Sequence, residues 1–113
     1  MREIKFRVWD KNECKMKVVK EMNLKEANLI NDLFPLMQYT NCCGINGKEI
    51  YEGDIVETTR TLNHIVGKVV MIKGCWYIQD GKDSYYRLIP RFGVVENRVI
   101  GNVYENKSLL EEE

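Results

Sequence analysis

Apolar residues alternate with charged ones at the start of this 113-residue chain, and this alternation constrains the fold more than any other feature. It runs from Arg2 to Trp9 with a period of two, which is typical of a half-buried strand. A second alternating segment, from Cys14 to Val18, follows the polar run 10–13. The two segments predict an N-terminal β-hairpin whose lysines and arginines face solvent. The residues expected to point inward are Ile4, Phe6, Val8, Cys14, Met16 and Val18.

Short segments of strand character continue through the second half of the chain at a spacing of about ten residues, which favours a barrel or sandwich over βαβ units. Glycines mark the turns between them, among them Asn46-Gly47 and Gly53-Asp54, where Asp54 can bond local backbone amides. A polar loop is predicted at residues 58–63. The predicted strands are 36–40, 48–51, 55–56, 65–72, 75–79, 85–89 and 98–104.

One segment before these strands has a different period. Its apolar residues recur at a spacing nearer to 3.6, Asn23 and Glu26 resemble a capping box, and Pro35 follows. We therefore predict one short helix from Leu24 to Leu33. The fold class is then mostly β: a small barrel or sandwich in the later part of the chain, with an N-terminal β-hairpin and one short helix. The chain is expected to form a single domain, 1–113, with the hairpin and helix at about 1–35, the barrel at about 36–106 and a frayed tail at 107–113.

Charge and hydropathy exclude several functional classes. The 17 basic and 17 acidic residues cancel, so the long-range field that non-specific nucleic-acid binding uses is absent. No apolar stretch approaches the roughly 18 residues of a membrane span. The charged N-terminus does not resemble a secretory signal, so we expect a cytoplasmic protein. The cysteines are then expected to be reduced thiols; they are Cys14, Cys42, Cys43 and Cys75.

Catalytic motifs are weak in this chain. A Ser-His-Asp triad would have to use the single histidine, His64, with Ser84 or Ser108, and neither serine has a Gly-x-Ser-x-Gly context. A Cys-His pair from Cys42 or Cys43 and His64 is conceivable, although a loop cysteine and a loop histidine explain these residues as well. We expect no catalytic residues.

Metal and cofactor motifs are also missing from the sequence. The cysteines lack the paired spacing of a zinc site, and Cys14 and Cys75 are expected to pack as small apolar residues in strands. The glycines form no phosphate-binding loop. We interpret the acidic group as solvated turn and strand-edge charges, and we expect no metal and no cofactor; its members are Glu49, Glu52, Asp54 and Glu57.

Aromatic residues remain as candidates for binding. Tyrosine and tryptophan are ordinary residues of packed strands, which is the interpretation that we favour. On strands that also carry lysine and arginine, they could instead stack unpaired bases. The candidate interaction surface consists of Trp9, Tyr39, Tyr51, Trp76 and Tyr104.

Three blocks of the sequence, in order, resemble the YopX family of phage and prophage proteins. They are residues 1–10, the segment 36–40 followed by 46–56, and residues 99–106. The resemblance implies a small β-rich domain with an SH3-like barrel, encoded by a phage or a prophage, and it implies no activity. The loop 41–45 departs from the polar loop that is usual in the family.

These observations favour a non-enzymatic accessory protein that acts as a protein-interaction domain. Its partner would be a host or phage protein, or another copy of the chain, bound through the barrel surface or an exposed strand edge. The alternative is a small barrel that binds single-stranded nucleic acid, which the zero net charge disfavours. A thiol-dependent enzyme that uses Cys43 is the third hypothesis.

Overall fold

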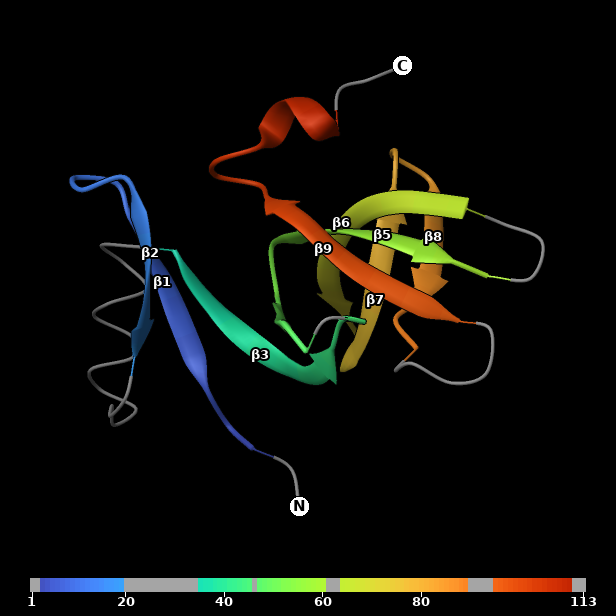
Figure 1. Ribbon diagram of the computed structural model, residues 1–113, viewed down its shortest axis with the longest axis horizontal. Coiled ribbons are helices and arrows are strands. Elements are labelled where there is room, and N and C mark those ends of the chain that lie inside the picture. Colours follow the sequence, from blue (N-terminus) through green and yellow to red (C-terminus); the bar gives the residue numbers. More distant parts are fainter. Residues whose placement is uncertain (1–2, 20–34, 46, 61–63, 90–94, 111–113) are drawn as a thin grey trace.

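The computed structural model describes residues 3–19, 35–45, 47–60, 64–89 and 95–110. These residues form two antiparallel sheets (Figure 1), so the prediction of a mostly-β chain is confirmed. The helix predicted from Leu24 to Leu33 lies outside the described residues. In the part that is described, no helix is long and apolar enough to cross a membrane.

The first sheet has four strands in the order β2-β1-β3-β4. Strand β1 pairs with β2 across residues 11–14 and with β3 on its other side. An irregularity between Tyr39 and Cys42 bends β3, and Asn41 has a φ of 67° there. The bounds of these strands are Phe6–Asp10 for β1, Lys15–Val19 for β2, Leu36–Cys43 for β3 and Glu49–Tyr51 for β4.

The second sheet has five strands in the order β8-β7-β6-β5-β9 and curls into a half-barrel (Figure 1). Successive strands from β5 to β8 pair as hairpins, and β9 returns to pair with β5. Lys73 and Gly74 have φ values of 50° and 83° in the predicted turn between β6 and β7. The strand bounds are Asp54–Thr59 for β5, His64–Ile72 for β6, Cys75–Asp80 for β7, Ser84–Arg87 for β8 and Glu96–Asn102 for β9.

The main core lies inside the half-barrel. Ile50 of β4 packs there with Ile78 of β7, and both side chains are completely buried. Burial of an isoleucine contributes about 1.5–3 kcal/mol, so β4 is held against the half-barrel by its apolar side chain. The first sheet is therefore joined to the second through β4. The buried members of this core are Ile50, Val56, Ile65, Val69, Ile78 and Leu88.

The turn between β4 and β5 connects the two sheets. Gly53 has a φ of 87°, as its place in the predicted turn requires. Its N–H donates to the carbonyl of Val69 at 3.0 Å, and its carbonyl accepts from the N–H of Val103 at 2.9 Å. The turn is thus fixed to β6 and to the segment that follows β9.

The predicted inward face of the N-terminal hairpin is right in part. Val8 is buried as predicted, but Arg7, which was expected to face solvent, is also only 8% exposed, whereas Ile4 and Val18 are 68% and 55% exposed. Alternation separates the two faces of a strand, but it cannot show that the second face is also covered, here through the buried acidic partner of Arg7. Cys14 is also exposed, in a turn with a φ of 55°, and not packed within a strand.

Two predicted irregular segments are ordered. Strand β5 continues through Thr58 and Thr59, so the predicted loop 58–63 was wrong at its start. Thr58 lies opposite Asn97 of β9, and both are fully buried. The predicted frayed tail was wrong as well for Lys107–Leu109, which form a 3-10 turn.

Candidate functional site

A buried ion pair lies where the two sheets meet. Arg7 of β1 donates from Nη2 to Oδ1 of Asp54 at 2.7 Å and to the carbonyl of Glu52 at 3.3 Å. The second carboxylate oxygen of Asp54 accepts the N–H of Tyr51 at 2.8 Å, which confirms its predicted bond to a local amide. Asp54 is only 2% exposed, so the expectation that it is a solvated charge was wrong.

The environment of Asp54 acts on its pKa in two directions. Burial raises the pKa, and the Arg7 guanidinium together with the Tyr51 N–H oppose that rise. Arg7 also stacks over the Tyr51 ring at 4.7 Å from its centroid. The charge pair is therefore enclosed by an aromatic ring and backbone groups, an arrangement that fixes the first sheet against the turn between β4 and β5.

Two predicted site residues, Tyr39 and Tyr51, lie inside this junction. They are 7% and 5% exposed, and their rings contact each other at a centroid distance of 5.5 Å. Lys5 lies over the Tyr39 ring and forms an ion pair with Glu49. These two tyrosines are therefore packing residues of the junction in this structure and do not present their rings on the surface.

The surroundings of Tyr39 in this junction raise the pKa of its hydroxyl. Its hydroxyl lies 3.6 Å from the Sγ of Cys43, and this hydrogen bond, together with burial, raises its pKa to about 12. Because the folded pKa exceeds the unfolded value of about 10, the stability that the neutral phenol contributes is expected to be lost as pH rises between these values. Ultraviolet absorbance should show a late tyrosine step that Tyr39→Phe removes. The step should move to lower pH in Cys43→Ala and stay in place in Cys14→Ala; an unchanged step in Cys43→Ala would contradict the assignment.

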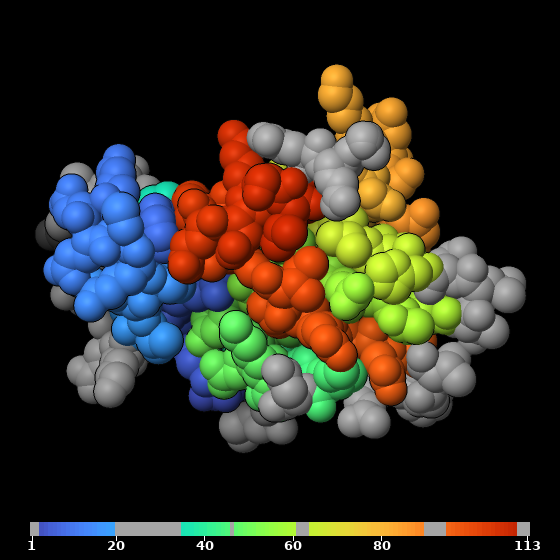
Figure 2. Space-filling model, turned by 45° about the horizontal axis from the view of Figure 1, so that its top comes forward, coloured from blue at the N-terminus to red at the C-terminus, as the bar shows by residue number. Residues whose placement is uncertain are grey.

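Two further candidates, Trp9 and Tyr104, form a stacked aromatic pair, which we call the aromatic ledge. The rings of Trp9 on β1 and Tyr104 after β9 lie 5.6 Å apart with an angle of 13° between their planes. Figure 2 shows the blue N-terminal hairpin and the red C-terminal segment side by side at this place. Tyr104 remains 39% exposed, and Trp9 is half-buried. Burial raises the pKa of Tyr104.

A hollow opens beside Tyr104 of the aromatic ledge. It has a volume of about 220 Å³ and is lined by Tyr104 itself and by apolar side chains that include Leu36 and Val70. Another hollow, of about 410 Å³, lies between the two sheets and includes Arg7, Met16 and Asn102. A partner that covers Tyr104 could therefore insert an apolar side chain into the first of these hollows.

Trp76, the fifth predicted residue, lies apart from the others. It is half-buried on β7 and packs against the main core. The structure thus brings together Trp9 with Tyr104 and Tyr39 with Tyr51, and it separates Trp76 from both pairs.

The predicted nucleophile and histidine candidates do not meet. His64 hydrogen-bonds Glu57 at 2.7 Å, and burial raises the pKa of the Cys42 thiol, which disfavours the reactive thiolate. A hollow beside His64 contains Asp80 and no cysteine. Within the described ranges, no three histidine, cysteine or acidic side chains are grouped to hold a metal ion.

Sequence reasoning missed Arg7 as a structural residue and underrated Asp54. The two lie 47 residues apart, so no local spacing relates them. The only available signal was Asp54 itself, directly after Gly53 in a turn, since an acidic residue at such a place can serve both the turn and a distant cation.

Its two antiparallel sheets define this chain as a β-rich protein. A crystal structure of protein EF1440 from Enterococcus faecalis matches with a TM-score of 0.63 and 22% sequence identity over 96% of this chain and 98% of that chain. This similarity shows a shared fold. The family model for the YopX protein matches residues 23–111, so the chain belongs to the YopX family. No curated protein matches the chain.

Proposed function

We propose that this chain is a non-enzymatic protein-interaction domain, encoded by a phage or prophage, whose half-barrel belongs to an SH3-like barrel that β4 helps to complete. The observation that carries the proposal is the aromatic ledge. Trp9 and Tyr104 are already stacked on each other, so little conformational entropy remains to be lost when a partner covers them. Tryptophan and tyrosine held in this way are the residues that most often dominate protein interfaces.

The surroundings of the aromatic ledge favour a protein partner with an apolar anchor. The hollow next to Tyr104 is lined by Leu36, Val70 and Val103, which offer an apolar floor to an inserted side chain. Charged residues stand at its edge, among them Glu52 and Lys68. An apolar centre with a polar rim is the usual layout of a protein interface.

The proposal is tested by capture from a bacterial lysate with the immobilised chain. Tyr104→Ala is expected to lose a partner that the unmodified protein retains, because it removes half of the stack. Met71→Ala is the control, since Met71 is 42% exposed on β6 and lines neither the hollow beside Tyr104 nor the hollow between the sheets. Thermal melting of both variants shows whether they are folded.

Sedimentation of the purified chain separates two kinds of partner. A dimer that Tyr104→Ala dissociates would identify a second copy of the chain as the partner. Equal capture by the unmodified protein and by folded Tyr104→Ala, with no difference in sedimentation, would refute the role of the aromatic ledge.

A further inference from the structure

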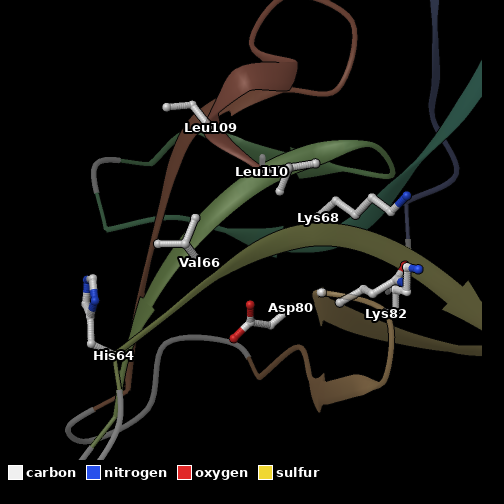
Figure 3. Close-up of a pocket in the computed structure, with 9 residues that line it drawn as sticks. His64, Val66, Lys68, Asp80, Lys82, Leu109 and Leu110 are labelled. Atoms are coloured by element: carbon white, nitrogen blue, oxygen red, sulfur yellow. The ribbon is translucent and has the colours of Figure 1, made fainter. Parts of the chain in front are cut away.

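A second hollow, which shares only Lys68 with the hollow next to Tyr104, has the chemistry of a ligand site. It is a hollow of about 590 Å³ on the outer side of β6 and β7 (Figure 3). Val66 lies on one side of it, and Leu109 and Leu110 of the C-terminal turn lie on the other. The full lining is His64, Val66, Lys68, Gln79, Asp80, Gly81, Lys82, Leu109 and Leu110.

Two lysines at one end of this hollow are available to a ligand. Figure 3 shows the side chains of Lys68 and Lys82 extending toward the same end, whereas His64 stands at the opposite end. The side-chain ammonium group of neither lysine forms an ion pair or a hydrogen bond with the part of the chain that the structure describes. Asp80 is the one carboxylate in the lining, so positive charge is in local excess. An anionic group is therefore the complementary ligand.

An exposed aromatic ring outside the lining of the hollow lies next to the turn that carries Lys82 and on the same face of the sheet as Lys68. The register pairs Lys68 of β6 with Gln79 of β7, and Gln79 with Tyr85 of β8, so the three side chains form one row across the same face of the sheet. Tyr85 is 44% exposed, and its hydroxyl donates to the carbonyl of Lys82 at 3.4 Å. This bond holds the ring next to the turn that carries the second lysine.

From this row we infer that the hollow binds single-stranded nucleic acid, with a backbone phosphate at Lys68 and Lys82 and an unstacked base on the Tyr85 ring. An acidic peptide could form ion pairs with the lysines, but this binding would not require the exposed tyrosine nearby. Single strands use both elements, because phosphates pair with cations and every base can stack on an aromatic ring. The amide of Gln79 lies between the two and can hydrogen-bond a base edge.

Because the chain has zero net charge, this binding is expected to be weak, and its salt dependence should report the two lysines of the hollow. With two lysines at phosphates, the logarithm of the association constant should fall against the logarithm of salt concentration with a slope of about −1.4. The dissociation constant at physiological salt is expected to be about 1–100 µM, and lower at low salt. The interaction is therefore local and weak, unlike the coating of duplex DNA by a strongly basic protein.

Fluorescence anisotropy with labelled oligo-dT and oligo-rU ten-mers tests the inference on the full chain. Lys82→Ala should lower the salt slope by about 0.7, because one phosphate contact is lost. Tyr85→Ala should weaken binding at least about fivefold, and Tyr85→Phe should restore it, because the ring and not the hydroxyl stacks on the base. Lys11→Ala is the control, since Lys11 is exposed in the N-terminal hairpin and its substitution removes the same charge as Lys82→Ala.

Four results would overturn the inference. Three are no binding of either oligonucleotide at low salt, equal effects of Lys82→Ala and Lys11→Ala on the slope, and binding that Tyr85→Ala leaves unchanged. The fourth is binding of polyglutamate with the affinity of the oligonucleotides, because the hollow would then be a site for acidic peptides. Because Tyr104→Ala should leave oligonucleotide binding intact, this test is independent of the one at the aromatic ledge.

Discussion

Replacing Asp54 by alanine is expected to lower the free energy of unfolding by about 3–5 kcal/mol at neutral pH. The substitution leaves the Arg7 guanidinium buried without its carboxylate and the Tyr51 N–H without its acceptor. Removing one partner of a buried pair is costly because the other charge stays out of water. For a domain whose total stability is about 5–15 kcal/mol, this loss is large.

Chemical denaturation followed by tryptophan fluorescence measures this effect, with Trp9 in the first sheet and Trp76 in the second. Asp83→Ala is the control, because Asp83 is exposed in a turn and its loss should change stability by no more than about 0.5 kcal/mol. The combined change Arg7→Met with Asp54→Leu should recover the part of the loss that comes from the unpaired charge, whereas the Tyr51 N–H still lacks its acceptor. Equal losses for Asp54→Ala and Asp83→Ala would show that the pair does not stabilise the junction.

Gly67→Ala is expected to cost about 2–3 kcal/mol, although it adds only one methyl group. Gly67 lies in the middle of β6, where a Cβ atom would overlap the backbone carbonyl of Gln79 and lie 2.8 Å from Cγ2 of Ile78. Backbone of a paired strand cannot move aside cheaply, so β6 and β7 would have to separate.

The matched control for this prediction is Gly74→Ala. Gly74 has a φ of 83° and nothing near the position of an added Cβ, so its substitution costs only the conformational strain of about 1–2 kcal/mol. Thermal unfolding of both variants compares the cost of steric crowding at Gly67 with the cost of backbone strain at Gly74. A Gly67→Ala variant as stable as the unmodified protein would mean that β6 and β7 do not approach as closely as described.

Strand positions were largely predictable because turn chemistry is local. Gly53, Lys73 and Gly74 adopt the positive φ values that their places in the turns indicated. Strand ends were less predictable: Thr58 is polar and was assigned to a loop, yet it is buried opposite Asn97. Hydropathy cannot reveal that a polar residue will be covered by a strand that pairs with it from elsewhere in the chain.

The candidate site was harder to predict than the strands. The sequence indicated that aromatic residues matter, but it could not separate Tyr39, which is buried, from Tyr104, which is exposed. Nor could it place Tyr85 beside Lys68, since that neighbourhood depends on the register of three strands. Which residues share a surface is a property of sheet pairing, and alternation along one strand carries no information about it.

The contact between Arg7 and Asp54 also bears on the order of folding. Strands β5 to β8 pair with their neighbours in sequence, so each hairpin closes a short loop, whereas the ion pair closes a loop of 47 residues. Contacts of short sequence separation form fastest. The half-barrel is therefore expected to assemble early, and the N-terminal hairpin to dock last, when the turn before β5 already holds the carboxylate in place.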